Sequence, residues 1–250
     1  MDSEVIWQKW PKELVIVRHG QSARNVAKDK AKKAKKEPSW ADAVRDVDTP
    51  LTQVGELQAI AVGTELRRRF PQGELGLDVI FASPYLRTRQ TAEGIIKGLG
   101  YYPKLVSEER IREIEFGILD GLTPDGIRAK YPEEVARRAK EGKYWYRPPG
   151  GESRPDVALR VHSFLGTLNR DYRKQRCLVI CHSVVVLIFR RLLERWTEEQ
   201  YIQVDKNEDP KNCSITSYKL DTDLNKLLLD EYNTICYPED KVEVPSADPA

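Results

Sequence analysis

The chain has 250 residues, and its 41 basic and 39 acidic side chains give a formal net charge of +2. A nucleic-acid-binding protein usually has a clear basic excess, and a membrane span needs about 20 consecutive apolar residues; the sequence shows neither feature. The composition therefore predicts a globular protein with a sizeable core, no nucleic-acid partner and no membrane contact.

The first predicted element is a strand over residues 13–18. Its apolar run, Leu14-Val15-Ile16-Val17, is typical of a strand buried on both faces, and it stops at Arg18-His19-Gly20. Six lysines then fall between residues 28 and 36. A solvated loop or short helix is the simpler interpretation of this segment, and a basic rim that attracts an anion is the alternative.

Helices and strands alternate through the next part of the chain. Thr52 suits the N-cap of a helix that ends near Phe70. A second buried strand over residues 78–82 precedes a helix that Gly100 terminates, and residues 104–107 form a short strand candidate. Residues 120–150 follow as a small helical insertion or lid, in which three aromatic residues, 144–146, form a small core or else stack on a ligand.

The remaining segments complete an α/β pattern. Ser153 begins a helix, and a third buried strand over residues 177–181 leads into an apolar helix over 184–196. Two neighbouring strands then lie at 214–220 and 227–232. Strands that alternate with helices predict a mostly parallel central sheet with helices on both faces. We expect one domain over residues 1–236 and a flexible tail over 237–250.

The cysteines and the first residues indicate the compartment. The four cysteines form no CxxC pair, and Cys177 and Cys181 are too far apart along one strand for a disulfide. Met1-Asp2-Ser3-Glu4 lacks the basic and apolar regions of a signal peptide. We therefore expect reduced thiols and a cytoplasmic location.

Charged side chains follow three of the predicted buried strands. Arg18 and His19 end the first, Arg87 follows the second, and His182 ends the third. Ligands collect at the carboxyl ends of such strands, and two planar guanidinium groups suit the oxygens of a phosphoryl group. The third histidine, His162, lies beside the apolar face of a predicted helix and is interpreted as a surface residue.

Further groups at the same edge fit an anion. Ser183 opens the apolar helix, whose first backbone N–H groups are free to bind an anion, and Asn25 adds an amide donor. A neutral histidine among these cations is a plausible nucleophile toward phosphorus. The residues alone do not choose a general acid among Glu113, Glu115 and Asp120.

Several motifs occur in the order found in a known family, the histidine phosphatase superfamily, which includes phosphoglycerate mutases. The chain resembles this family over about residues 12 to 220. The motifs are Arg18-His19-Gly20 with Asn25, Leu51-Thr52-x-x-Gly55-x-x-Gln58-Ala59, Ser83-Pro84-x-x-Arg87-Thr88, Glu113 with Phe116-Gly117, Gly121-Leu122-Thr123, Gly150-Gly151-Glu152-Ser153 and His182.

The resemblance implies the family's fold, with a small lid insertion, and a role for each matching residue. His19 is implied to become phosphorylated, and Arg18, Arg87 and His182 to form the phosphate pocket. Glu113 holds the position of the general acid, and Asn25 is a further phosphate contact. The resemblance implies no metal and no cofactor, because the arginines supply the positive charge.

Two positions depart from the family pattern. The third strand ends in Cys181-His182-Ser183, where many members have glycine after the histidine, so Ser183 adds a side chain beside the phosphate. Arg24 stands where mutases often have an aromatic residue and suggests a different contact to the leaving group. Both residues are therefore candidate substrate-binding residues.

The modest length of the insertion favours a phosphatase over a mutase, since mutases have a longer insertion there. The predicted substrate is a small anionic phosphate ester such as a sugar phosphate or bisphosphate. A phosphoglycerate mutase-type phosphoryl transfer and a non-catalytic phosphate-binding relative are the alternatives. The sequence is silent on the oligomeric state.

Overall fold

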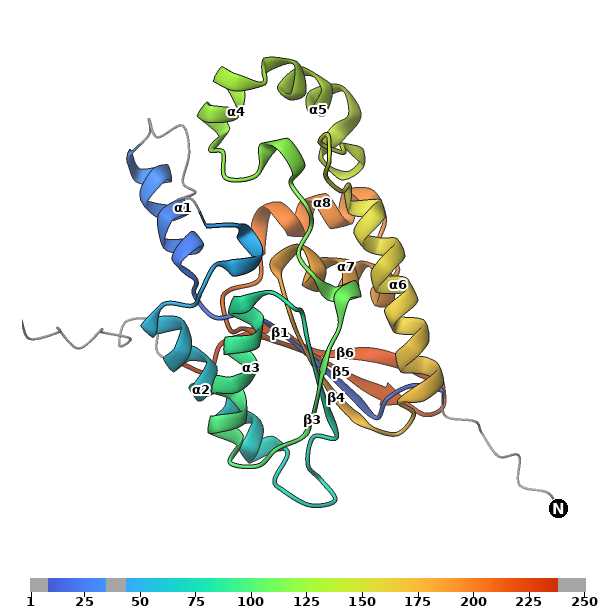
Figure 1. The fold of residues 1–250 in the computed structure, drawn as a ribbon. Coiled ribbons are helices and arrows are strands. Elements are labelled where there is room, and N and C mark those ends of the chain that lie inside the picture. Colours follow the sequence, from blue (N-terminus) through green and yellow to red (C-terminus); the bar gives the residue numbers. More distant parts are fainter. Residues whose placement is uncertain (1–8, 35–43, 238–250) are drawn as a thin grey trace, which may run out of the picture.

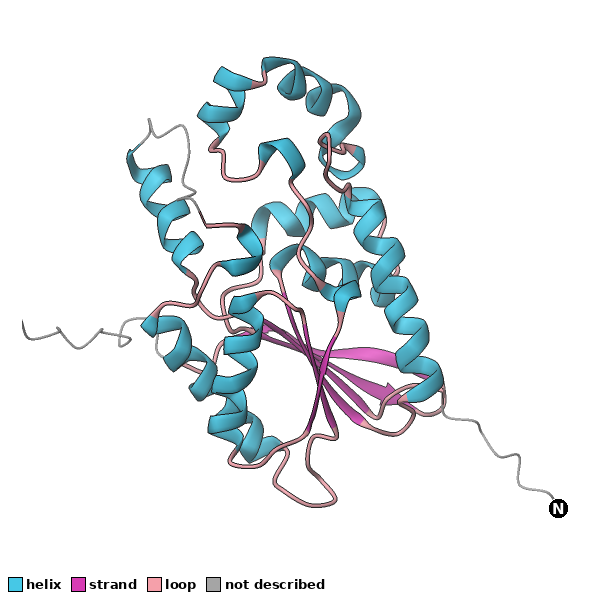
Figure 2. Ribbon diagram, in the orientation of Figure 1, coloured by secondary structure: helices cyan, strands magenta, loops and turns pink. Residues whose placement is uncertain are grey.

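The computed structural model of the chain describes residues 9–34 and 44–237. Within this part a six-stranded sheet lies at the centre, in the order β3-β2-β4-β1-β5-β6 (Figures 1 and 2). Neighbours among β1, β2, β3 and β4 are parallel, whereas β5 is antiparallel to both β1 and β6. The prediction of a mostly parallel sheet is confirmed. The strands are β1 (Glu13–Arg18), β2 (Val79–Ala82), β3 (Lys104–Ser107), β4 (Arg176–Cys181), β5 (Ile215–Asp221) and β6 (Lys226–Thr234).

The strand register brings three predicted strand ends together. Arg18 at the end of β1 pairs with Cys181 at the end of β4, and the backbone N–H of His19 donates to the Cys181 carbonyl at 2.9 Å. On the other side of β4, Ala82 of β2 pairs with Ile180. The residues that follow β1, β4 and β2 therefore meet at one edge of the sheet.

Helices cover both faces of the sheet, as predicted (Figure 1). On one face, buried residues of α2 (Gln53–Arg69) and α3 (Leu86–Leu99) form a core with the sheet. On the other face, α6 (Arg154–Asp171) and α7 (Ser183–Glu194) do the same. The predicted caps are confirmed: the Thr52 side chain accepts from Gly55 N–H, and Gly100 ends α3 with φ of 73°.

The predicted insertion contains two helices, α4 (Pro124–Lys130) and α5 (Pro132–Trp145), at the top of Figure 1. Its aromatic residues belong to the fold: Tyr144 is buried with its ring 5.4 Å from that of Tyr201, and Tyr146 donates to Glu134 at 2.6 Å. The interpretation of these residues as a small core is thereby favoured over stacking on a ligand. Tyr201 lies on α8 (Glu198–Asn207), a helix that the sequence pattern did not reveal.

The lysine-rich segment begins as a helix, α1 (Ala23–Ala34), followed after an interval by the 3₁₀ turn Asp46–Asp48. Lys35 and Lys36 lie outside the described residues, as do residues 238–250 of the expected tail. Tyr237, the first residue of that tail, donates from its hydroxyl to the Asn212 carbonyl at 2.6 Å.

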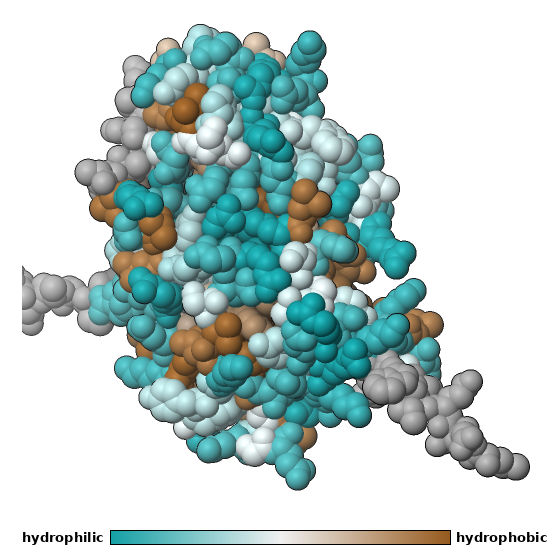
Figure 3. Space-filling view, turned by 45° about the vertical axis from the view of Figure 1, so that its right-hand side comes forward, coloured by the Kyte–Doolittle hydropathy of each residue, from teal (hydrophilic) through white to brown (hydrophobic). Residues whose placement is uncertain are grey.

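The surface agrees with the composition. Hydrophobic residues on the face drawn in Figure 3 form separate patches within a largely hydrophilic surface. Among the described helices, none combines the length and the apolar character that crossing a bilayer requires. The described cysteines are all free thiols, as predicted.

Candidate active site

The two ring nitrogens of His19 have different and fixed roles. Nδ1 lies 2.7 Å from the Gly20 carbonyl, which only accepts hydrogen bonds, so Nδ1 has the proton. Nε2 lies 3.2 Å from Nε of Arg87, which only donates, so Nε2 presents its lone pair. Both neighbours thus select the same neutral tautomer, with a bare nitrogen facing the arginine.

The surroundings of His19 also keep the ring neutral. The side chain is only 4% exposed. Burial lowers the pKa of His19 well below its usual value, and the positive charges of Arg87 and Arg18 lower it further. His19 is therefore uncharged near neutral pH, as a nitrogen nucleophile must be.

A close backbone contact fixes the segment that contains His19. A Cβ atom added to Gly20 would lie 2.5 Å from the Gly55 carbonyl oxygen at the start of α2. Only glycine allows this approach, which explains the glycine of the Arg18-His19-Gly20 motif. The Gly20 N–H donates to the Thr91 hydroxyl of α3 at 3.1 Å, so both helices of this face hold the segment.

His182 follows β4 and lies against His19, with the ring centroids 5.2 Å apart. Its Nε2 is 2.8 Å from the Ser83 hydroxyl, while its Nδ1 is buried without a partner among the described residues. Burial lowers the pKa of His182 well below its usual value, with Arg87 the next cause. The sequence prediction that these two histidines converge is confirmed by the geometry.

Arg87 opens α3 and is almost fully buried. Besides its contact with His19, the guanidinium donates to the Asp46 carboxylate, with Nη1–Oδ1 of 3.0 Å and Nη2–Oδ2 of 3.2 Å. Nη1 also donates to the Asp46 backbone carbonyl at 2.6 Å. The four hydrogen bonds of this guanidinium thus go to the histidine and to one aspartate.

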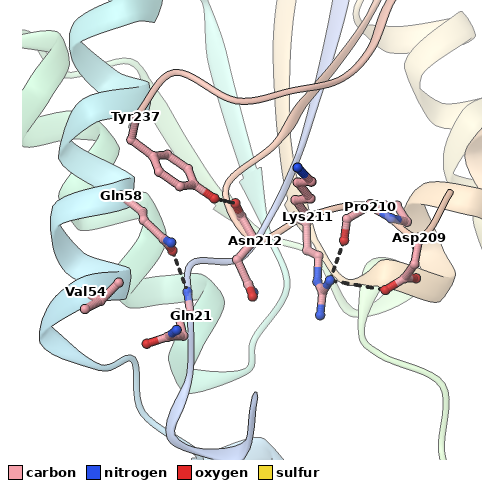
Figure 4. A pocket seen from close by; sticks show the side chains of 9 residues that line it. Gln21, Val54, Gln58, Asp209, Pro210, Lys211, Asn212 and Tyr237 are labelled. Atoms are coloured by element: carbon pink, nitrogen blue, oxygen red, sulfur yellow. Dashed lines mark hydrogen bonds and ion pairs between the residues drawn. The ribbon is translucent and has the colours of Figure 1, made fainter. Parts of the chain in front are cut away.

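Arg18 is engaged on the other side of His19. Its Nη1 lies 3.4 Å from Asp209 Oδ2 and donates to the Pro210 carbonyl, in the segment before β5. This contact borders a cavity of about 500 Å³, shown in Figure 4. The cavity is also lined by Gln21 after β1, by Val54 and Gln58 of α2, and by Lys211 and Asn212 before β5. Tyr237, after β6, completes the lining.

Glu113 is a buried carboxyl group close to the two arginines. Burial raises its pKa, while a hydrogen bond from the Ile114 N–H, at 2.9 Å from Oε1, and the charge of Arg87 act in the opposite direction. A raised pKa suits a proton donor. Arg160 of α6 holds the surrounding segment, because it donates to the carbonyls of Arg110, Arg112 and Glu113 at 2.8, 2.7 and 3.2 Å.

The other predicted contacts lie around this centre. The Asn25 Oδ1 atom accepts from Ser22 and Asn212, so the Nδ2 group is the part of this amide that can donate to a ligand. Arg24 is held between Asp46 (Nη1–Oδ1 2.5 Å) and Asp120 (Nη2–Oδ1 2.9 Å). The Ser183 hydroxyl donates to Asp209, and no side chain caps the N-terminus of α7.

Sequence reasoning missed the residues that hold the site together. Four residues that the sequence did not single out each contact a predicted site residue: Asp46, Asp209, Asn212 and Arg160. None of these residues lies at a spacing from its partner that a sequence motif would show. The one available signal was the charge of Arg160 within an otherwise apolar helix face, which could have marked it as a residue with a buried partner.

Comparisons with known proteins agree with these motifs. The model of the histidine phosphatase superfamily (branch 1) matches residues 14–233. A 2,3-bisphosphoglycerate-dependent phosphoglycerate mutase of Methylobacterium radiotolerans is 34% identical over 190 residues, covering 75% of this chain and 81% of the mutase. Phosphoserine phosphatase 1 of Hydrogenobacter thermophilus is 33% identical over 175 residues, covering 69% and 71%. A solved mycobacterial glucosyl-3-phosphoglycerate phosphatase has a TM-score of 0.62 at 24% identity, covering 89% of this chain and 99% of that one.

Proposed function

The chain belongs to branch 1 of the histidine phosphatase superfamily, and we propose that it hydrolyses small phosphate monoesters through a phosphohistidine on His19. The observation that carries this proposal is the fixed tautomer of His19. Its Nδ1 is held as N–H by the Gly20 carbonyl, and its Nε2 is bare and faces Arg87. A buried neutral imidazole whose unprotonated Nε2 faces the arginine of the phosphate pocket is prepared for attack on phosphorus.

In the first half-reaction the phosphoryl group binds between Arg18 and Arg87, against the free N–H groups at the start of α7. A bond forms between His19 Nε2 and phosphorus while the bond from phosphorus to the ester oxygen breaks. Glu113 gives its proton to the leaving oxygen, so the product leaves as an alcohol. The two guanidinium groups balance the charge on the phosphoryl oxygens.

In the second half-reaction water replaces the histidine. The Glu113 carboxylate, which lost its proton in the first step, accepts a proton from the attacking water. The new P–O bond forms as the N–P bond breaks, and the electron pair returns to His19 Nε2. Inorganic phosphate is released, and both residues regain their starting protonation states.

The ion pairs of Arg24 bear on the class of substrate. Arg24 and Arg87 both pair with Asp46. Arg24 therefore lies near the phosphate site, which supports its role as a contact to the leaving group. Its charge is already balanced by Asp46 and Asp120. This balance favours a monophosphate over a bisphosphate, because a second phosphate group would have to compete with two carboxylates for Arg24. Phosphoserine, phosphoglycerates and sugar monophosphates form the first panel.

The test is hydrolysis of p-nitrophenyl phosphate in EDTA by the wild type, by His19→Ala and by the control His162→Ala, which changes an exposed histidine on α6. We expect turnover in the wild type and the control and none in His19→Ala. An alkaline quench during turnover should trap one acid-labile phosphoryl group on the wild type and on the control, and none on His19→Ala. Activity that survives in His19→Ala would disprove the phosphohistidine.

A mutase activity is the second candidate, because the 34% identical relative is a phosphoglycerate mutase. Both reactions share the phosphorylation of His19 and differ in the acceptor of the phosphoryl group. The interconversion of 2- and 3-phosphoglycerate in the presence of 2,3-bisphosphoglycerate distinguishes them. Phosphate release without interconversion supports the phosphatase, and interconversion faster than phosphate release supports the mutase. Phosphate binding with neither reaction indicates a non-catalytic relative.

A further inference from the structure

The Asp46 carboxylate accepts hydrogen bonds from Nη1 and Nη2 of Arg87, the nitrogens that a bound phosphoryl group would use. Nε of Arg87 faces His19, while Nη1 and Nη2 donate to the two carboxylate oxygens of Asp46. Paired donation of this kind is the arrangement that arginine also makes with a phosphate. A carboxylate and a phosphoryl group on His19 therefore require the same donors.

The pair is shielded from solvent, with 5% of the Arg87 side chain and 14% of the Asp46 side chain exposed. A shielded ion pair is screened less by salt and water than one on the surface, so its loss carries a measurable cost. Asp46 also has a second partner, Arg24, at 2.5 Å. A carboxylate displaced from Arg87 thus keeps one cation, which makes the exchange feasible.

Resting on the proposed function, we infer that Asp46 is a resident competitor for the phosphate site. Its carboxylate accepts from the Arg87 donors, and a phosphate monoester or inorganic phosphate displaces it. The apparent dissociation constant of a ligand rises by the reciprocal of the fraction of molecules in which its site is free. Asp46 therefore weakens the binding of substrate and of the product phosphate, and it limits product inhibition.

The opposite role for Asp46 has a different signature. If Asp46 served to position Arg87 for catalysis, its loss would weaken phosphate binding and lower kcat. If it competes, its loss strengthens phosphate binding and lowers KM together with the inhibition constant of inorganic phosphate. The direction of the change in phosphate affinity therefore separates the two roles.

The experiment is calorimetric titration of the full-length protein with inorganic phosphate, for the wild type, Asp46→Asn and Asp48→Asn. Asparagine retains the shape of the side chain and removes its charge. We expect Asp46→Asn to bind phosphate about tenfold more tightly, a change typical of one charged hydrogen-bonded contact. Asp48 is the matched control because it is exposed and lies two residues further along the same 3₁₀ turn, so its change should have little effect.

A double-mutant cycle tests whether the effect passes through Arg87. In the Arg87→Ala background, Asp46→Asn should no longer strengthen phosphate binding, because the shared donors are gone. Equal or weaker phosphate binding by Asp46→Asn, or an equal gain in Asp48→Asn, would overturn the inference. Tighter phosphate binding by Asp46→Asn in a protein that hydrolyses no phosphate monoester would uphold the inference and reject the proposed hydrolysis.

Discussion

At the scale of single side chains, the pKa values of His19 and Glu113 are shifted in opposite directions. Burial lowers the pKa of His19, which favours its neutral form, and raises the pKa of Glu113, which therefore keeps its proton to a higher pH than a free glutamate. The same physical cause acts on both, because burial disfavours whichever form is charged. A neutral nucleophile beside a protonated acid is the pair that phosphoryl transfer to a histidine needs.

The pH dependence of kcat follows from these two directions. As the pH rises through the raised pKa of Glu113, the acid loses its proton and phosphoryl transfer slows. As the pH falls, His19 stays neutral until the pH is well below 6.5, so the acidic limb of the plot of kcat against pH lies at lower pH than for a free histidine. We expect Glu113→Gln to remove the alkaline limb and to lower kcat by about 10²- to 10⁴-fold on alkyl phosphates.

The leaving group provides the control for this prediction. p-Nitrophenolate leaves without a proton, so Glu113→Gln should slow the hydrolysis of p-nitrophenyl phosphate far less than that of an alkyl phosphate. Steady-state kcat on both substrates, measured across the pH range, checks the prediction. Equal losses on the two substrates would show that Glu113 is not the proton donor.

At the scale of elements, α6 positions Glu113 although it contributes no residue of its own to the motifs. Arg160 on this helix donates to three backbone carbonyls in the segment that contains Glu113 and also pairs with Glu152. We expect Arg160→Ala to lower kcat by about 10- to 100-fold, since misplacement of a catalytic group by about 1 Å has an effect of that order. The inhibition constant of inorganic phosphate should stay nearly constant, because Arg160 donates to this segment and not to the phosphate site.

Arg170 is the matched control on the same helix. It is exposed, and its guanidinium pairs with the adjacent Asp171. Arg170→Ala should retain the wild-type kcat. A loss of phosphate affinity in Arg160→Ala as large as its loss of kcat would instead indicate general damage to the fold.

The contact between the His19 segment and α2 gives a second prediction at this scale. A Cβ atom at Gly20 would meet the Gly55 carbonyl at 2.5 Å, whereas a Cβ atom at the exposed Gly166 of α6 meets nothing within 4 Å. We expect Gly20→Ala to lower the free energy of unfolding by more than about 2 kcal/mol, as overpacking does. Gly166→Ala should raise it by about 0.5–1 kcal/mol. Urea denaturation of both variants measures the two changes, and similar behaviour of the pair would refute the argument from close approach.

The sequence allowed the strands, most helices and the convergence of His19, Arg87 and His182 to be predicted, because each depends on local patterns. A buried strand is a short apolar run, and a cap or a strand end is marked by its own residue type. The helix α8 was missed because its face is mostly polar, with Tyr201 its one buried residue. Local periodicity contains no information about such a helix.

Partners such as Asp46, Asp209 and Arg160 were beyond prediction for a different reason. Each is joined to its site residue by tertiary structure across 41, 191 and 47 positions of the chain. A single sequence contains no signal for such pairs, because any of its many charged residues fits the chemistry equally well. The convergence of the candidate catalytic residues was thus predictable, and the residues that contact and hold them were not.

At the scale of the whole molecule, burying two neutral histidines links stability to pH. The pKa values of His19 and His182 are lowered in the folded protein, chiefly by burial, whereas an unfolded histidine has a pKa of about 6.5. Below that pH the unfolded chain binds more protons, so the free energy of unfolding falls as the pH falls. We expect a slope of up to about 1.4 kcal/mol per pH unit for each histidine.

Urea midpoints at about pH 7.5 and pH 5.5 measure this slope across the pKa of an unfolded histidine. The variant with both His19→Asn and His182→Asn should lose much less stability over the interval than the wild type, because asparagine does not titrate. His162→Asn should keep the wild-type slope, since that ring is exposed. Glu113, whose raised pKa makes the folded protein keep a proton longer, acts in the opposite direction equally in all three proteins. An unchanged slope in the double variant would mean that the buried histidines are not the groups through which acid destabilises the fold.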